Sequence, residues 1–206
     1  MKRTLAYFIT PHGFGHAARA AAVMQAAQAH DPEIHFRIYS TTPDWFFRQS
    51  RIQYTQVSVH TDVGIIQHTP FHEDFDTTLS ALSELIPYSP KLLSRLTDDF
   101  ARHQVSAVFC DIAPLGIAAA QQAAIPSILI ENFTWDWIYE AYLNDYAKFS
   151  PYIVEFERLF SLADFHIQTN PLCRVFPRAD RCVNPISRCS FHPLSLIHIS
   201  EPSRPY

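Results

Sequence analysis

Glycine is scarce in this 206-residue sequence, which has only four glycines and four cysteines and lacks any long apolar run. The cysteines form no Cys-x-x-Cys pair, so the spacing typical of zinc sites is missing and we expect no bound metal. The apolar runs fall far short of the ~20 residues that cross a bilayer, so we expect no membrane span. The N-terminal residues run directly into a Pro-His-Gly turn without the h-region of a signal peptide, which makes the cytoplasm the expected location.

Positive charge is not in excess either, because the formal net charge is −4. We therefore expect no nucleic-acid partner and no binding to an anionic membrane surface. Hydrophobic residues make up 48% of the chain. That content and length suffice for one α/β domain with a real core, and are too small for two full domains.

Short strand-like runs alternate with helical segments along the first 170 residues. The expected strands are 5–10, 34–39, 52–59, 107–111, 126–130 and 165–168. The expected helices are 15–29, 43–47, 73–85, 90–103, 114–124, 135–146 and 151–162, with Thr42 and Ser89 as N-caps of the second and fourth. Residues 61–72 are expected to form a loop. Strands that alternate with helices predict βαβ units, so the expected fold class is α/β, a Rossmann-like doubly wound parallel sheet of six or seven strands.

The C-terminal residues differ in character from the rest. After Asn170 the periodic pattern decays, and residues 194–206 resemble the translated end of a transposon-type sequencing adaptor, with Ser203 where threonine is expected. The alternative is an ordinary C-terminal tail. The adaptor interpretation predicts that the native protein continues further. It also predicts that residues from about 171 onward pack poorly, because a foreign sequence was never matched to this core.

Two of the four glycines, Gly13 and Gly15, fall in one turn between the first strand and the first helix. Glycine permits positive φ and close ligand approach, and a helix N-terminus suits an anion or a developing negative charge. The turn fits G-x-G-x-x-A, but the second strand does not end in the acid that a dinucleotide site needs, which counts against NAD or FAD. The alternative is a purely structural turn with His12 and His16 solvated.

Asp111 ends an apolar strand and precedes a helix. In an open parallel sheet ligands bind at the carboxyl ends of the strands, where both His16 and Asp111 are expected to lie. A carboxylate beside an imidazole fixes its tautomer and raises its basicity, as a general base requires. We therefore expect His16 and Asp111 within hydrogen-bond reach of each other. A helix cap or turn residue is the alternative role of Asp111.

A third signal is the aromatic segment 131–139, which again follows a strand and carries Asn and Asp beside tryptophan and tyrosine. Aromatic faces beside such polar groups suit a sugar ring, although an aromatic stripe also occurs in many cores. Both interpretations stay open. The candidate substrate-binding residues are His12, Gly13, Phe14, Gly15, Arg19, Asn132, Trp135, Asp136 and Tyr139.

Three stretches, 7–19, 110–114 and 132–139, resemble a GT-B-like family in the same order. That family includes the N-terminal region of plant L-arabinokinase and related bacterial predicted glycosyltransferases. The resemblance covers roughly residues 4–170, and Pro11 and Ala18 stand where Gly and Thr are expected. It implies that residues 1–170 are the N-terminal, acceptor-side half of a GT-B fold. Residues 171–193 would then be a truncated inter-domain segment, and 194–206 a non-native tail.

The resemblance implies transfer of a glycosyl group from a nucleotide sugar to an acceptor hydroxyl. His16 would take the acceptor proton, Asp111 would orient His16, and residues 135–139 would line the acceptor pocket. The partner would be a small-molecule or glycan acceptor. The nucleotide sugar would bind a second domain, so we expect no cofactor here and no transferase activity of the chain alone. The alternatives are a non-catalytic sugar-binding or regulatory domain of an L-arabinokinase-like kinase and, further behind, a nucleotide-binding oxidoreductase. The sequence assigns no oligomeric state.

Overall fold

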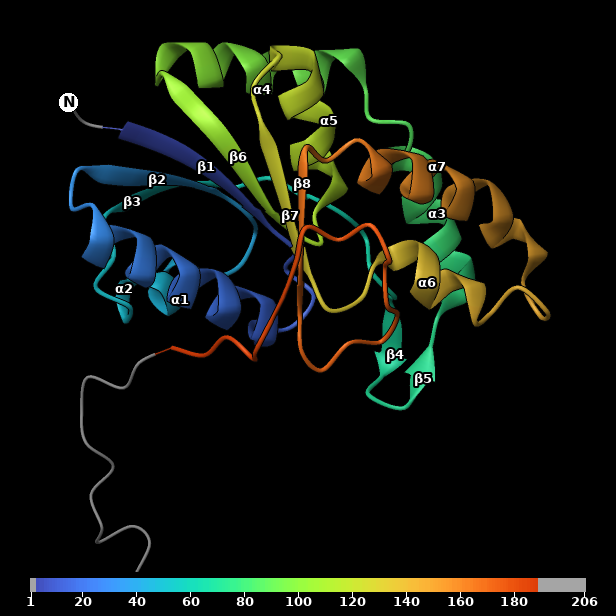
Figure 1. Cartoon of the computed structure of the whole chain (residues 1–206). Coiled ribbons are helices and arrows are strands. Elements are labelled where there is room, and N and C mark those ends of the chain that lie inside the picture. Colours follow the sequence, from blue (N-terminus) through green and yellow to red (C-terminus); the bar gives the residue numbers. More distant parts are fainter. Residues whose placement is uncertain (1–2, 189–206) are drawn as a thin grey trace, which may run out of the picture.

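A computed structural model describes residues 3–188 and shows one seven-stranded sheet with helices on both sides (Figure 1). The strands of this sheet are β1 (Arg3–Ile9), β2 (Ile34–Tyr39), β3 (Tyr54–Val57), β6 (Val105–Asp111), β7 (Ser127–Glu131), β8 (Phe165–Thr169) and β9 (Arg181–Val183). A separate hairpin contains β4 (Gln67–Thr69) and β5 (His72–Glu73). The helices are α1 (Phe14–His30), α2 (Asp44–Arg48), α3 (Phe75–Leu85), α4 (Pro90–Arg102), α5 (Pro114–Ala123), α6 (Trp135–Glu140), the 3₁₀ turn η1 (Ala147–Phe149) and α7 (Ser150–Ser161). No helix in this part of the chain is long and apolar enough to cross a membrane.

The sheet order is β3-β2-β1-β6-β7-β8-β9, and every neighbouring pair is parallel. The chain runs outward from β1 to β3, then returns to β6 on the other side of β1. The expected Rossmann-like doubly wound parallel sheet is therefore confirmed. Such a reversal of strand order leaves a crevice at the carboxyl ends of β1 and β6, where open α/β sheets bind ligands.

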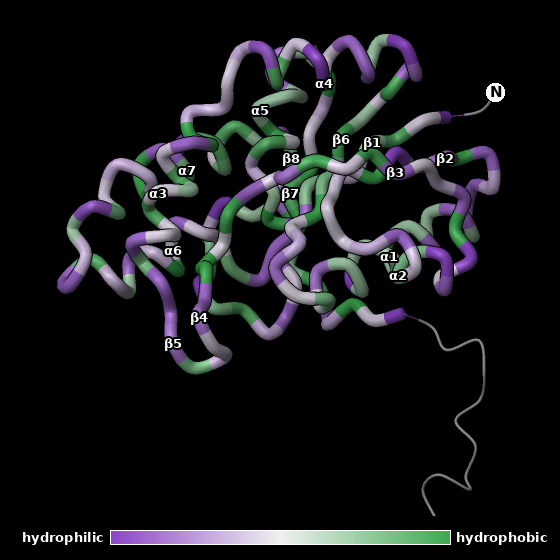
Figure 2. Tube along the Cα trace, turned by 180° about the vertical axis from the view of Figure 1, so that it is seen from behind, coloured by the Kyte–Doolittle hydropathy of each residue, from purple (hydrophilic) through white to green (hydrophobic). Residues whose placement is uncertain are grey.

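Alternating side chains of β1 supply both layers of the core. Ala6 and Phe8 belong to the layer beneath α4, α5 and α7, whereas Tyr7 and Ile9 belong to the layer beneath α1 and α2. In Figure 2 hydrophobic colour is concentrated on the central strands and hydrophilic colour on the outer turns of the helices. The alanine-rich face of α1 buries Ala17 and Ala20, whose small side chains let the helix lie close to the sheet.

Several local expectations are confirmed, and some are wrong. The Ser89 hydroxyl accepts a hydrogen bond from the Leu92 amide and caps α4 as expected. Thr42 does not cap α2, because the helix begins after Pro43 and the Thr42 hydroxyl pairs with Ser40 instead. Residues 61–72, expected to be a loop, contain β4 and the start of β5. Helix α6 ends at Glu140 rather than 146.

The segment after residue 170 is also more ordered than expected. Residues Arg181–Val183 form β9, which pairs with β8. The Gln168 side chain donates to the Arg174 carbonyl and accepts from the Phe176 amide. Hydrogen bonds therefore tie residues 171–183 to the sheet, although none of these residues is buried, which agrees with the expectation that they pack poorly. The pattern missed them because long-range pairing, rather than periodicity, orders this segment. Residues 194–206 lie outside the described part of the chain.

Candidate functional site

The candidate site lies where β1, β6, β7 and β8 end at one edge of the sheet. Ile9, the last residue of β1, is paired in register with Asp111, the last residue of β6. Gly13, with φ of +87°, then turns the chain into α1, which places His16 in the first turn of that helix. Because neighbouring parallel strands end together, the β1 loop and the β6 carboxylate face the same crevice.

His16 and Asp111 are in direct contact, as expected from the sequence. The distance from His16 Nδ1 to Asp111 Oδ1 is 2.8 Å, Asp111 is fully buried, and the His16 side chain is 11% exposed. An edge-to-face contact with Phe133, with ring centroids 5.5 Å apart, holds the other side of the imidazole. The pair therefore has the geometry of an imidazole oriented by a carboxylate.

Arg19 is the third member of this arrangement. Its Nε donates to Asp111 Oδ2 at 2.7 Å and its Nη2 to Asp111 Oδ1 at 2.6 Å. Its Nη1 donates to Asn132 Oδ1 at 2.6 Å and to Thr169 Oγ1 at 3.2 Å. One buried guanidinium thus joins α1 to the ends of β6, β7 and β8.

This network fixes the ionisation of Asp111. Burial acts to raise the pKa of Asp111, but the charge and hydrogen bonds of Arg19, together with the hydrogen bond to His16, outweigh it and hold the pKa below the ordinary value. An ionised carboxylate only accepts hydrogen bonds, so its contact with His16 Nδ1 favours the tautomer with the proton on Nδ1, although Arg19 Nη2 also lies 3.2 Å from that nitrogen. In a neutral imidazole the other nitrogen, Nε2, is then the bare one and can accept a proton.

A cavity of about 310 Å³ opens beside His16 and Arg19. Its wall includes Asn132, Phe133 and Thr169. The chain segments around Pro171 and Pro185 close another side of it. This volume lies near the lower end of the range for small-ligand pockets, about 300–1,000 Å³.

His12 takes a different position from His16. It packs edge-to-face on Trp135, with ring centroids 5.2 Å apart, and burial together with the charge of His16 lowers its pKa. Gly64, with φ of +68°, lies directly against it, and a Cβ at Gly64 would come within 2.6 Å of His12 Nδ1. Only glycine fits such a position without displacing the His12 ring.

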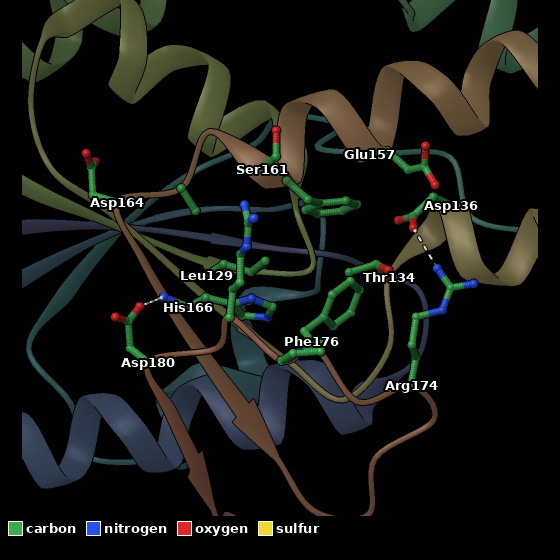
Figure 3. A pocket seen from close by; sticks show the side chains of 14 residues that line it. Leu129, Thr134, Asp136, Glu157, Ser161, Asp164, His166, Arg174, Phe176 and Asp180 are labelled. Atoms are coloured by element: carbon green, nitrogen blue, oxygen red, sulfur yellow. Dashed lines mark hydrogen bonds and ion pairs between the residues drawn. The ribbon is translucent and has the colours of Figure 1, made fainter.

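The remaining candidates are spread over three environments. Gly15, Arg19 and Asn132 line the cavity beside His16. Phe14 is 49% exposed and stacks on Phe46, toward α2. Trp135 and Tyr139 are buried in the core, and Asp136 lines a second cavity (Figure 3). The structure does not bring the 135–139 segment into the cavity beside His16, and its expected binding role stays a prediction.

Asp62 is a buried acid that the sequence reasoning missed. It accepts hydrogen bonds from Thr10 at 2.8 Å and from Thr61 at 2.7 Å, and burial raises its pKa to about 6 despite those bonds. Tyr88 and Tyr139 fix the same loop by donating to the carbonyls of Thr61 and Gly64. Nothing in the local pattern of residues 61–66 indicates that Asp62 is buried. Thr169 was also missed, but it could have been found, because it is a polar residue that ends a recognisable strand.

Comparison with solved structures identifies the architecture. MurG of Acinetobacter baumannii is 16% identical with a TM-score of 0.53, and the alignment covers 90% of this chain and 46% of MurG. A UDP-glucose: anthocyanidin 3-O-glucosyltransferase in complex with UDP is 13% identical with a TM-score of 0.57. The alignment covers 90% of this chain and 53% of that enzyme. The glycosyltransferase of kitacinnamycin is 14% identical with a TM-score of 0.57, and the alignment covers 100% of this chain and 56% of that protein. The α/β Rossmann-like fold is therefore the one that these GT-B glycosyltransferases share, and this chain spans about half of their length.

A sequence relative adds to this likeness. L-arabinokinase of Arabidopsis thaliana is 29% identical over 149 residues, which covers 67% of this chain and 13% of that protein. No protein-family model matches the sequence.

Proposed function

We propose that this chain forms the acceptor side of a glycosyltransferase, in which a glycosyl group passes from a nucleotide sugar to an acceptor hydroxyl. The observation that carries the proposal is the His16–Asp111 pair, which lies beside a cavity at the carboxyl edge of the sheet. The likeness of the fold to GT-B glycosyltransferases supports it. The nucleotide sugar would bind a second domain facing this edge.

The proposed chemistry assigns a defined role to each member of the network. The acceptor oxygen forms a bond to the anomeric carbon, while the bond from that carbon to the nucleoside diphosphate breaks and its electron pair leaves with the diphosphate. His16 Nε2 takes the acceptor proton, and ionised Asp111 holds Nδ1–H and stabilises the imidazolium that forms. Arg19 is a positioning residue, because its hydrogen bonds hold Asp111 rather than the acceptor.

The test uses a protein that contains this region together with its nucleotide-sugar-binding domain, assayed for release of nucleoside diphosphate in the presence of acceptors. His16→Ala should lower turnover by about 10²–10⁴-fold, the usual contribution of a general base, and leave the circular dichroism spectrum unchanged. His30→Ala, at the exposed end of α1, is the matched control and should keep full activity. Near-normal turnover of His16→Ala would sink the proposal, and loss confined to His12→Ala would move the role to His12.

Asp111→Asn is expected to cost less turnover than His16→Ala, because it disturbs only the orientation and charge of the imidazole. The network adds a complication, since the same substitution removes the counter-ion of buried Arg19. Its thermal stability therefore has to be measured alongside its activity. A smaller loss of turnover in a folded Asp111→Asn protein is the expected result.

A second candidate function rests on the L-arabinokinase match, in which this region corresponds to 13% of a much longer protein. The chain would then be a non-catalytic sugar-binding or regulatory domain of a sugar kinase. The two candidates differ in what His16→Ala does. In a binding domain the substitution weakens sugar binding, measured by calorimetry, and no nucleotide-sugar turnover exists for it to remove.

A further inference from the structure

A second and larger cavity, of about 650 Å³, lies on the other side of β7 and β8, between α7 and the segment that joins β8 to β9 (Figure 3). It shares no lining residue with the cavity beside His16. Phe160 and Phe176 form part of its wall, and Asp136 and Glu157 lie together at one end beside Arg174. The acidic end is therefore separate from the proposed transferase chemistry.

Three carboxylates converge at that end. Asp136 and Glu140 lie four residues apart on α6, which places them on one face of the helix. Glu157 comes from α7, which packs against α6. One oxygen from each of the three lies within 4.8 Å of the others.

The cluster is short of positive charge. Arg174 pairs with Asp136 at 3.7 Å and with Glu140, and so offers one positive charge to three carboxylates. Among residues 3–188, Glu157 forms no ion pair. Like charges this close destabilise a fold unless a cation compensates them.

Asp136 provides an independent sign that a ligand is missing. It is 3% exposed, and its Oδ1 atom is buried without a hydrogen-bond partner. A buried carboxylate oxygen without a partner costs free energy that a bound cation would recover.

We propose that Asp136, Glu140 and Glu157 bind a divalent cation, and that this cation is calcium. Calcium takes six to eight oxygen ligands at about 2.3–2.6 Å in a flexible arrangement, so three carboxylate oxygens within 4.8 Å of one another can converge on it with small side-chain movements. Magnesium demands near-ideal octahedral geometry, keeps several waters and is usually bound through one or two carboxylates, which fits a group of three less well. Two positive charges also balance the excess left by Arg174, and the open cavity supplies water for the remaining ligand positions.

The bound cation would tie α6 and α7 together, so its first measurable effect is on stability. With the intact chain, we expect the melting temperature to rise with calcium chloride concentration, and not with sodium chloride at equal ionic strength. Terbium, which replaces calcium in oxygen sites, should give luminescence sensitised by Trp135 and Trp137 of α6, and calcium should quench it by competition.

Variants separate the proposed site from general surface binding. Asp136→Asn and Glu157→Gln should each weaken calcium binding by about 10–100-fold. Glu155→Gln is the matched control, because it removes the same charge from α7 at a residue that pairs with Arg158 outside the cluster. It should change the affinity less than twofold, on the order of ordinary surface substitutions. If Asp136→Asn fails to fold, Glu157→Gln decides the question alone, because Glu157 is exposed and its substitution leaves the core intact.

Three results would overturn the proposal. The first is an unchanged melting temperature up to about 10 mM calcium, above the weakest calcium modules. The second is an equal loss of terbium signal in Glu155→Gln and Glu157→Gln. The third is an equal response to magnesium, which would remove the assignment to calcium. None of these measurements depends on transferase activity.

Discussion

Arg19 is the side chain on which the candidate site depends most. The sequence places it among substrate-binding candidates, but the structure buries it and directs its donors to Asp111, Asn132 and Thr169. Buried ion pairs need excellent geometry and complete hydrogen bonding, and the two parallel bonds to Asp111 provide both. Removing one partner would leave the other as an uncompensated buried charge.

We therefore predict that Arg19→Met destabilises the fold by about 3–5 kcal/mol, the usual cost of breaking a buried pair. Arg48→Met is the control, because Arg48 pairs with Asp44 but its side chain is 75% exposed, and it should cost about 0–1 kcal/mol. Urea denaturation at pH 7, followed by tryptophan fluorescence, measures both. A cost below about 1 kcal/mol for Arg19→Met would show that Asp111 finds another partner or takes up a proton.

At the scale of elements, helix α4 is joined to β2 by a small polar network. Asp99 accepts hydrogen bonds from Arg37 Nε at 2.9 Å and from the Tyr39 hydroxyl at 2.5 Å. Burial acts to raise the pKa of Asp99, but the hydrogen bonds from Tyr39 and Arg37 outweigh it, so the pKa lies below its ordinary value. The folded state thus favours the ionised carboxylate.

This direction fixes the expected effect of pH. A carboxyl group with a lowered folded pKa contributes stability above its unfolded pKa of about 3.9, and that contribution is lost as the pH falls toward the folded value. Asp99→Asn should therefore lower the melting temperature at pH 7, and its curve should approach that of the wild type below about pH 4. The melting temperature of Asp98→Asn, at the exposed neighbouring position, should stay parallel to that of the wild type from pH 7 to pH 3. A constant difference between Asp99→Asn and the wild type from pH 7 to pH 3 would contradict the linkage.

At the scale of the whole molecule, the segment after β8 completes the sheet and one wall of each cavity. Strand β9 pairs with β8, and Asp180 accepts a hydrogen bond from the His166 amide at 2.7 Å. The 171–188 segment also lines the cavity beside His16 and the acidic cavity. Residues 181–183 are therefore paired with the sheet, although the sequence pattern sets the segment after residue 170 apart from it.

Two shortened chains test this assignment. A chain that ends at Pro193 should melt at the same temperature as the full chain, because residues 194–206 are expected to be foreign to the core. A chain that ends at Asn170 should melt at a clearly lower temperature, because β8 then loses its neighbour and Gln168 loses two hydrogen-bond partners. Differential scanning calorimetry compares the three. If the chain that ends at Asn170 melts at the same temperature as the full chain, β9 contributes nothing to stability. If the chain that ends at Pro193 melts at a lower temperature than the full chain, the tail is native structure.

The sequence by itself determined the parallel α/β fold and the first contact of the site. Alternating strands and helices, Gly13 before α1 and an acid ending β6 are local patterns, and the rules of parallel sheets convert them into the His16–Asp111 pair. Gly15, expected in the same turn, lies in the first turn of α1. Only the tertiary structure decided the partners of Arg19, which lie 92 to 150 residues away in sequence. It alone also decided the pairing of β9 and the position of Asp136 at the second cavity. The physical reason is that periodicity records which face of an element is buried, whereas long-range contacts depend on how the elements pack, which a single local segment does not encode.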